Sequence, residues 1–303
     1  MNQLQKYTWL INTIRRAGEI SLKELSDKWE RATDYSDGKK LHRSTFNHWR
    51  DAIVEQFGII IDCRRVGGYL YSIANPEGID DDKLKKWMLD SYAVSAVIGE
   101  NIALKDRILV DEIPSGREHL ATLIEAMKEN RVVEIAYRSF GREHPSSFAI
   151  RPYCLKLFDN RWYILARNNR DEIRLYGLDR IESVLPTDAT FRLPDGFDAE
   201  SYFANAYGIV IGYDVKPRTI VLRAYGEHKY YMASLPLHHS QTMTADCDEY
   251  ADFELFVAPT YDFIMKLLQF GPRVEVLRPA ELRVVMKEEL KNTYDYYKND
   301  RKC

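Results

Sequence analysis

Arginine and tyrosine side chains recur at short intervals along residues 131–185, and this combination suits a ligand that carries phosphate groups or aromatic bases. Guanidinium groups form charge-assisted bonds with phosphate oxygens, and aromatic rings stack on bases. Similar residues also occur in ordinary half-buried strands, in which arginine heads reach past apolar neighbours to solvent. The side chains concerned are Tyr137, Arg151, Tyr153, Arg161, Tyr163, Arg174, Tyr176 and Arg180.

The order of short motifs in this stretch resembles the WYL family of bacterial ligand-sensing regulators. The motifs are Arg151-Pro152, Arg161-Trp162-Tyr163-Ile164, Arg174-Leu175-Tyr176 and Leu178-Asp179-Arg180-Ile181. The tripeptide Trp162-Tyr163-Ile164 stands where the family has Trp-Tyr-Leu. The resemblance implies an Sm-like β-barrel that carries a polar, effector-sensing cluster. The short strands and turns between about 132 and 193 are themselves typical of an all-β barrel.

By position, the resemblance implies a set of ligand-binding residues on this barrel. It places Trp162 and Ile164 in the barrel core instead. Tyr153 departs from the family pattern, because some relatives carry His there, so the resemblance does not identify the ligand. The implied ligand-binding residues are Tyr137, Ser139, Arg151, Tyr153, Arg161, Tyr163, Arg174 and Arg180.

A second group of basic residues lies near the N-terminus. Residues 38–50 contain four Lys or Arg and two His but no acidic residue. The flanking sequence predicts a winged helix-turn-helix. Its first helix ends at Gly18, its second begins at the capping box Ser21–Glu24, and its third runs from about Ser44 to Gly58. A β-hairpin turned by Gly67-Gly68 follows.

The N-terminal half of a recognition helix is the part that reaches base edges in the major groove. The base-reading candidates are Thr45, Asn47, His48 and Arg50. The phosphate-binding candidates are Lys39, Lys40, Arg43, Ser44, Arg64 and Arg65. The alternative is a solvated polar helix face in a winged helix that binds protein.

We expect an α+β multidomain chain that combines a winged helix-turn-helix, an Sm-like barrel and a ferredoxin-like C-terminal domain. Beyond residue 218 the patterns follow a β-α-β-β-α-β order, and a final helix covers about 280–297. This region resembles the WCX-type extension that often accompanies the WYL barrel, most clearly at Phe270-Gly271-Pro272. The predicted segments are 1–75 for DNA binding, 76–130 for a helical linker or dimerisation region, 131–195 for the barrel, 196–217 for a connector and 218–303 for the C-terminal domain.

Composition sets limits on the function. The formal net charge is −3, so nucleic-acid binding requires a local basic patch. No apolar run approaches the ~20 residues that span a bilayer, and the N-terminus lacks a secretory signal pattern, so we expect a cytoplasmic protein. Cys63, Cys154, Cys247 and Cys303 form no C-x-x-C pair, which argues against a disulfide scaffold and a zinc finger.

Enzyme chemistry is disfavoured, and we predict no catalytic residue, no metal and no cofactor. The common nucleotide-binding, hydrolase and metalloprotease motifs are missing from the sequence. A nucleophilic Ser139 needs a nearby base, and none has a recognisable spacing. His238-His239, with Asp246 and Cys247, could hold a metal, but adjacent histidines on a strand point to opposite faces, which favours a structural role.

The sequence therefore predicts a ligand-responsive transcriptional regulator. Its partners would be a double-stranded DNA operator, a nucleotide or oligonucleotide effector and a second copy of the chain in a homodimer. The alternative is a general RNA- or single-strand-binding module without operator-specific regulation, because Sm-like barrels and ferredoxin-like folds both bind nucleic acid.

Overall fold

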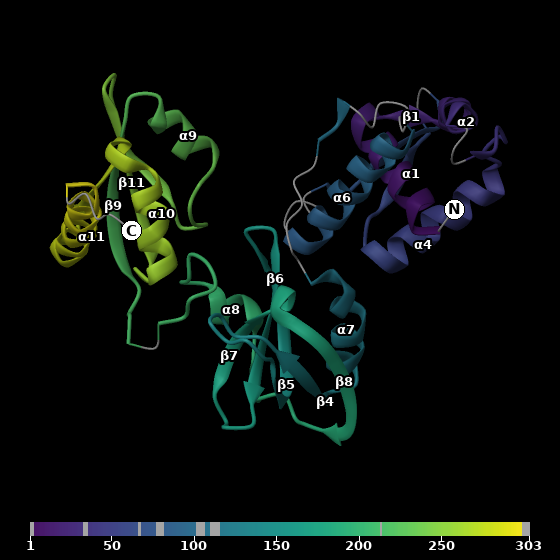
Figure 1. Ribbon diagram of the computed structural model, residues 1–303. Coiled ribbons are helices and arrows are strands. Elements are labelled where there is room, and N and C mark those ends of the chain that lie inside the picture. Colours follow the sequence, from purple (N-terminus) through teal and green to yellow (C-terminus); the bar gives the residue numbers. More distant parts are fainter. Residues whose placement is uncertain are drawn as a thin grey trace. The chain divides into compact units, whose positions relative to one another are not determined.

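The computed structural model describes residues 3–32, 36–65, 68–76, 82–100, 107–109, 116–212 and 214–298. It divides into two compact units, Met1–Asp111 and Glu112–Cys303. Each unit combines helices with antiparallel strands (Figure 1). The predicted α+β class is therefore confirmed.

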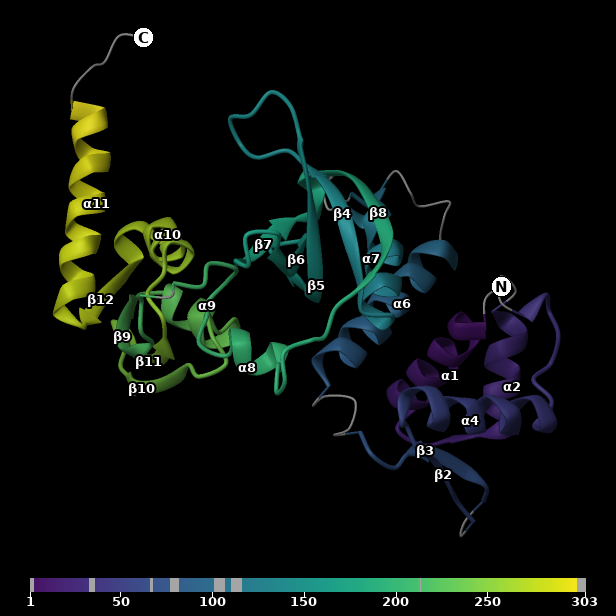
Figure 2. The same ribbon diagram turned by 90° about the horizontal axis from the view of Figure 1, so that it is seen from below.

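The first unit joins helices to a small three-stranded sheet, with strand order β1-β3-β2. Strands β2 and β3 pair as a hairpin that extends away from the helices (Figure 2). Of the predicted hairpin turn, Gly68 has a φ of +126°, and Gly67 lies outside the described residues. The elements are α1 (Gln3–Ala17), β1 (Ile20–Ser21), α2 (Leu22–Arg31), α4 (Arg43–Phe57), β2 (Ile61–Arg64), β3 (Leu70–Ile73) and α6 (Lys83–Glu100).

Local capping signals fix the helix ends in this unit. The Ser21 hydroxyl accepts a hydrogen bond from the Glu24 backbone N–H at 3.2 Å, and the Glu24 carboxylate accepts one from the Ser21 N–H at 2.9 Å. This is the predicted capping box. Gly18 and Gly58 have φ values of +71° and +62° directly after α1 and α4, where a side chain would be strained.

An aromatic core holds the first unit together. The Trp29 ring of α2 makes edge contacts with Trp9 of α1 and Trp49 of α4, at centroid distances of 4.8 and 5.0 Å. Phe46 of α4 contacts Tyr71 of β3 in the same way at 4.6 Å. Edge-to-face pairs add stability beyond their buried area, so these contacts tie the helices to the hairpin.

Helix α6 belongs to the first unit, because its Leu89 is buried in the same core. The next described helix, α7 (Leu120–Lys128), belongs to the second unit, where Leu123 and Ala126 are buried. The predicted helical region 76–130 is thus divided between the two units. Buried apolar residues of this region pack in two separate cores.

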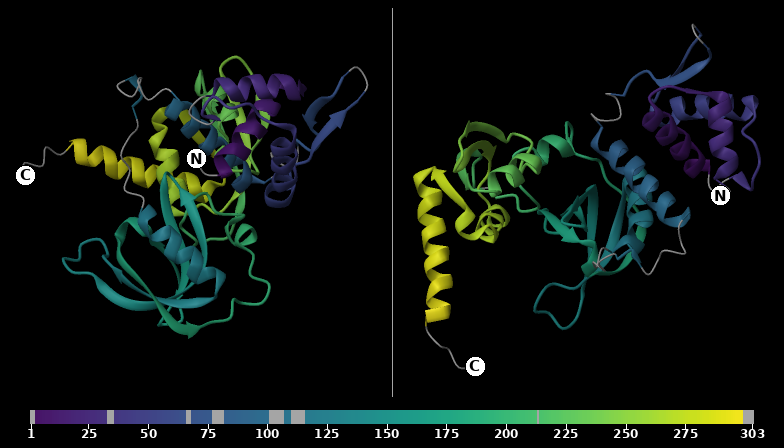
Figure 3. Two further views of the ribbon diagram at one scale, coloured as in Figure 1. Left: turned by 90° about the vertical axis from the view of Figure 1, so that its right-hand side faces the viewer. Right: turned by 90° about the horizontal axis from the view of Figure 1, so that it is seen from above.

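The second unit begins with a five-stranded antiparallel sheet in the order β7-β6-β5-β4-β8. Helix α7 lies against this curved sheet (Figure 3), with Ile135, Ile150 and Ile164 in the shared core. Asp159 and Asn160 have φ values of +48° and +60° and form the tight turn between β5 and β6. The elements are η2 (Arg117–His119), β4 (Arg131–Tyr137), β5 (Ser146–Phe158), β6 (Arg161–Asn168), β7 (Ile173–Gly177), η3 (Leu178–Arg180) and β8 (Ile181–Thr190).

The C-terminal part of this unit contains the β-α-β-β-α-β order that the sequence predicts. Its four-stranded sheet has the order β10-β11-β9-β12. Leu222, Phe253 and Val276 lie in one core with Phe263 and Leu267 of the second helix. The elements are α8 (Ala199–Phe203), β9 (Arg218–Tyr225), α9 (His228–Ser234), β10 (Thr242–Asp246), β11 (Tyr250–Val257), α10 (Tyr261–Gln269), η4 (Gly271–Arg273), β12 (Val274–Arg278) and α11 (Ala280–Lys298).

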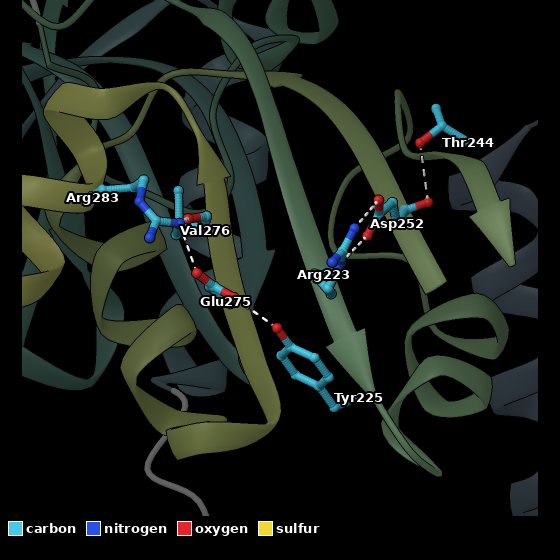
Figure 4. Close-up of polar contacts among 7 residues, drawn as sticks. All are labelled: Arg223, Tyr225, Thr244, Asp252, Glu275, Val276 and Arg283. Carbon is cyan, nitrogen blue, oxygen red and sulfur yellow. Dashed lines mark hydrogen bonds and ion pairs between the residues drawn. The ribbon is translucent and has the colours of Figure 1, made fainter. Parts of the chain in front are cut away.

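Polar contacts link the strands of this sheet on its other face (Figure 4). The Arg223 guanidinium donates two hydrogen bonds to the Asp252 carboxylate, at 2.8 and 2.9 Å. It also lies 3.6 Å from the centroid of the Tyr250 ring. The hydrogen bonds from Arg223 to Asp252 raise the pKa of the guanidinium. This bidentate pair stabilises the pairing of β9 with β11, in which Arg223 stands opposite Asp252.

A second polar contact on this sheet is centred on Glu275 of β12. Its carboxylate accepts hydrogen bonds from the Tyr225 hydroxyl at 2.7 Å and from Arg283 of α11 at 2.8 Å (Figure 4). These bonds, the one from Tyr225 first, hold the pKa of Glu275 below its usual value. The start of α11 is therefore attached to the sheet by a charged contact as well as by Leu282 in the core.

Hydrogen bonds attach the connector between the two sheets to strand β5 on one side and to helix α10 on the other. The Lys156 ammonium of β5 donates a hydrogen bond to the Gly208 carbonyl at 2.5 Å. Asp262 of α10 accepts hydrogen bonds from the Ile209 and Val210 N–H groups at 2.9 and 3.1 Å. A Cβ on Gly208 would lie 2.3 Å from the Asp262 carboxylate, so the close approach requires glycine.

The surroundings of the residues considered for metal or thiol chemistry indicate a role in the fold. His238 and His239 lie in the turn that precedes β10, so the strand geometry assumed for the pair does not apply, and their rings lie 4.0 Å apart. The reason is local: His238 is buried, with Nε2 bonded to the Ala204 carbonyl at 2.9 Å and Nδ1 bonded to Ser240 at 2.7 Å. Burial raises the pKa of the Cys154 thiol to about 11, which disfavours the reactive thiolate.

No helix in the described ranges is both long and apolar enough to cross a membrane.

The lowered pKa of Lys156 predicts that the stability of the fold depends on pH. Burial lowers its pKa from 10.5 to about 8, against the opposing charge of Asp262. The folded state therefore binds fewer protons than the unfolded state between these values, and stability rises as the pH increases from about 8 to about 10.5. Because the ammonium keeps partial contact with solvent, we expect a rise of about 1 kcal/mol in the free energy of unfolding.

Denaturant unfolding of the wild type and Lys156→Met at pH 7.5 and 10 measures this effect. The rise should be absent in Lys156→Met and present in Lys216→Met, which removes an exposed lysine of the connector. An equal pH response in all three proteins would show that the buried ammonium does not limit stability.

Candidate functional site

A cavity of about 460 Å³ lies beside the loop that follows β4. It contains two residues of the predicted ligand-binding set, Ser139 and Arg180. Next to this cavity, the loop that joins β4 to β5 projects beyond the sheet (Figure 2). The lining residues are Arg138, Ser139, Phe140, Gly141, Arg142, Asp179, Arg180 and Glu182. We call this the η3 cavity.

Strand pairing creates the η3 cavity from two distant parts of the chain. The end of β4 pairs with the start of β8, with Tyr137 opposite Ile181. The Arg138 N–H then donates to the Arg180 carbonyl at 2.9 Å, and the Arg138 side chain binds Glu182 through Nε at 2.7 Å. The last strand of the sheet therefore brings η3 against the loop after β4.

Arg180 occupies the centre of this arrangement. Its guanidinium carbon lies 5.0 Å from the centroid of the Tyr137 ring and 4.2 Å from that of Phe140. Burial raises the pKa of the Tyr137 hydroxyl, with a smaller opposing effect from Arg180. In the described part of the chain, no carboxylate lies within ion-pair distance of Arg180. The cation is held by rings and its N–H groups are available to an anion.

Asp179, the residue before Arg180, carries a nearly buried carboxylate that pairs with a different arginine. Its side chain is 9% exposed, and its Oδ2 lies 3.5 Å from the Arg161 guanidinium. Its Oδ1 has no hydrogen-bond partner among the described residues, an unusual state for a buried carboxylate oxygen. The sequence prediction did not include Asp179. The sequence motif that could have indicated it is Leu178-Asp179-Arg180-Ile181, from which the prediction selected only Arg180 as a ligand-binding residue.

Arg151 and Arg174 lie in a different group, around the turn between β6 and β7. Arg151 forms an ion pair with Asp171 at 3.4 Å, and Arg174 donates to Glu172 at 3.0 Å. Hydrogen bonds from Asn168 and then Arg174 lower the pKa of Glu172. A neighbouring cavity of about 660 Å³ includes Arg174 but also both carboxylates. These two arginines are thus paired within the fold.

The remaining predicted residues have mixed surroundings. Tyr153 is buried against Phe191 and Phe197, with ring centroids 6.0 and 5.3 Å away. Tyr163 is half-buried, and burial raises the pKa of its hydroxyl. The structure thus brings Tyr137, Ser139, Arg161, Tyr163 and Arg180 together around Asp179. It places Arg151, Arg174 and Tyr153 elsewhere on the same sheet.

Helix α4 carries the predicted DNA-reading residues. Its buried side chains include Phe46 and Trp49, so the opposite face is left to solvent. Two of the candidates, Asn47 and Arg50, are half-buried. The exposed candidates on α4 are Arg43, Ser44, Thr45 and His48.

Several of the predicted phosphate-binding side chains have acidic neighbours. Arg64 pairs with Glu19 at 2.7 Å, and Lys40 lies 4.0 Å from Glu30. The base-reading candidate Arg50 likewise lies 3.8 Å from Asp51. In the described part of the chain, the exposed Lys39, Arg43 and Arg65 have no such partner. The uncompensated positive charge is therefore smaller than the residue count implies.

Within the described residues, no group of three or more His, Cys, Asp or Glu side chains is placed to hold a metal ion.

Comparison with protein families identifies two regions of the chain. Residues 118–186 match the WYL domain, and residues 216–294 match the WCX domain. The chain therefore contains both domains, as the resemblance in the sequence implied. The first match covers α7 and most of the five-stranded sheet, and includes the η3 cavity.

Among solved structures, one similar chain is the proteasome accessory factor B/C (PafBC) of Arthrobacter aurescens, with 19% identity and a TM-score of 0.28. The match covers 61% of this chain and 28% of that chain, so this protein spans less than a third of its length. Another is a CRISPR Cas-related protein, with 11% identity, a TM-score of 0.41 and coverage of 93% and 83%. No curated protein matches this sequence.

The η3 cavity predicts opposite effects of two neighbouring substitutions on anion binding. Arg180→Ala removes the cation and should lower the affinity for a short single-stranded oligonucleotide at least tenfold. Asp179→Asn removes a negative charge beside the same cavity and should raise that affinity about three- to tenfold at low salt. Fluorescence anisotropy with a labelled oligonucleotide measures both.

Asp188→Asn is the matched control, because Asp188 is an exposed residue of β8 outside the cavity. A decrease in affinity on Asp179→Asn would contradict this electrostatic model and would indicate that the carboxylate accepts a hydrogen bond from the ligand.

Proposed function

We propose that this protein is a ligand-responsive transcriptional regulator that binds an operator through α4 and senses an anionic effector at the η3 cavity. The observation that carries the proposal is the position of Arg180 in the WYL domain. This cation lies beside two aromatic rings, lines a cavity and has no carboxylate partner within ion-pair distance in the described part of the chain. Phosphate groups and stacked bases are the chemistry that such a site accommodates.

Domain assignments form part of the proposal. The helices α1, α2 and α4 followed by the β2–β3 hairpin support a winged helix-turn-helix. The pairing of β8 with β4 supports an Sm-like barrel, and the order β10-β11-β9-β12 supports a ferredoxin-like C-terminal domain.

Regulation requires two arrangements of the protein that differ in affinity for the effector. We propose a homodimer in which effector binding changes the spacing of the two α4 helices and hence operator affinity. The effector is a nucleotide or a short single strand. A cytoplasmic location and a non-enzymatic role complete the proposal.

The second candidate is a general RNA- or single-strand-binding module. The ion pairs of Arg64 with Glu19 and Lys40 with Glu30 favour it, because they reduce the positive charge available to a DNA duplex. In that case the nucleic acid would bind at the η3 cavity, and α4 would play no part in recognition.

Separate substitutions in α4 and in the η3 cavity test the proposed function. Asn47→Ala/Arg50→Ala should lower the affinity for specific duplex DNA about 10- to 100-fold, because base-edge contacts are lost, and leave single-strand binding unchanged. Arg180→Ala should do the reverse, keeping basal duplex binding but losing its response to the effector. Fluorescence anisotropy with duplex DNA from upstream of the coding sequence, at two salt concentrations, measures both affinities.

Gln56→Ala serves as the control, because Gln56 is an exposed residue at the far end of α4. Unchanged duplex affinity in Asn47→Ala/Arg50→Ala would eliminate α4 as the reading helix and support the second candidate.

A further inference from the structure

A groove of about 380 Å³ lies between α1 and α2 of the first unit, and the proposed function does not use it. Three of its residues, Trp9, Thr13 and Arg16, are four and three positions apart on α1 and so share one face of that helix. The small side chains of Ala17 and Ala32 leave room between the larger ones. The lining residues are Trp9, Thr13, Arg16, Ala17, Lys28, Arg31 and Ala32.

The charge of this groove is entirely positive. Arg16, Lys28 and Arg31 are exposed, and no lining residue is acidic. Like charges gathered in one groove repel each other, and although solvent screens this repulsion at exposed positions, they raise the local positive potential that attracts an anion. The chain as a whole is slightly acidic, with a net charge of −3, so this grouping is not a consequence of composition.

Neighbouring cations in the same unit differ from these three. Arg15 lies 4.0 Å from Asp90, and Arg64 lies 2.7 Å from Glu19. Within the described ranges, Arg16, Lys28 and Arg31 have no carboxylate within ion-pair distance. The unit therefore pairs several of its basic side chains, whereas in the described residues the three of the groove lack such a pair and only Lys28 interacts at longer range with a carboxylate, that of Glu24.

Helix dipoles explain only part of this arrangement. Arg16 stands in the last turn of α1, and Lys28 and Arg31 stand in the last turn of α2. Cations stabilise helix C-termini by about 0.3–1 kcal/mol each. That effect operates at each helix separately and does not require the three side chains to line one groove.

We propose that this groove binds a phosphate group through Arg16, Lys28 and Arg31, with Trp9 as an aromatic wall beside it. Two guanidinium groups and an ammonium can each donate to phosphate oxygens. Trp9 is partly exposed and held by its edge contact with Trp29, so its indole offers a fixed surface to an attached base. The volume falls within the range of small-molecule sites.

The phosphate can come from two sources, a nucleoside polyphosphate or the backbone of a nucleic acid. Calorimetric titration of the full chain with ATP and with inorganic pyrophosphate tests the first source. Duplex DNA binding at two salt concentrations tests the second. Saturable binding of ATP or pyrophosphate assigns the groove to a small ligand, whereas a change confined to duplex affinity and its salt dependence assigns it to the backbone.

The decisive variants are Arg16→Ala/Arg31→Ala and the single variant Lys28→Gln, all at exposed positions. The double variant should lower phosphate affinity more than tenfold, and Lys28→Gln about threefold. Lys6→Ala/Lys23→Ala removes the same charge from α1 and α2 outside the groove and should change affinity less than twofold. Circular dichroism verifies that each variant folds.

An equal loss in the control variant, or no response to any phosphate or duplex ligand, overturns the assignment. Tighter binding of an acidic peptide than of ATP, pyrophosphate or duplex also overturns it and points to a protein partner. The groove shares no residue with α4 or with the η3 cavity, so its failure leaves the proposed function standing.

Discussion

The pairing of β4 with β8 is the constraint on which the candidate ligand site depends. It joins the first and last strands of the five-stranded sheet, opposing Tyr137 to Ile181. Without this pairing, Arg180 would lie far from the Phe140 ring and from Arg138, which precede it by about 40 residues in the chain. The ladder hydrogen bonds and the buried core beneath them therefore set the geometry of the η3 cavity.

Local features were predictable from the sequence because local rules govern them. The Ser21–Glu24 capping box, the glycine ends of α1 and α4, and the apolar faces of the helices follow from spacing alone. The pairing of arginines with carboxylates was not predictable. Arg161 meets Asp179 only after β6, β7 and η3 have folded back, so neither the ion pair nor the unbonded Oδ1 has a sequence signature.

Whether an arginine has a carboxylate partner distinguishes the roles of the basic residues better than the residue type does. Arg223 forms a bidentate bond with Asp252 and acts as part of the sheet (Figure 4), and Arg151 pairs with Asp171 at the edge of the predicted site. Arg180 and Arg16 have no such partner among the described residues. A guanidinium that the fold already satisfies has little to gain from an anionic ligand, so the arginines without a carboxylate partner are the stronger candidates for anion binding.

The turn η3 also contacts the segment with which the described part of the second unit begins. A Cβ on Gly116 would lie 2.2 Å from the Leu178 backbone, so the segment before α7 packs directly on η3. His119 then bonds to the Ile181 carbonyl at 2.8 Å. Leu178 and Arg180 are the two ends of η3 and Ile181 follows it directly, so these two contacts hold the turn that carries Arg180. The described start of the second unit is therefore attached to the turn that carries Arg180, beside a sheet core that is close-packed and resists deformation.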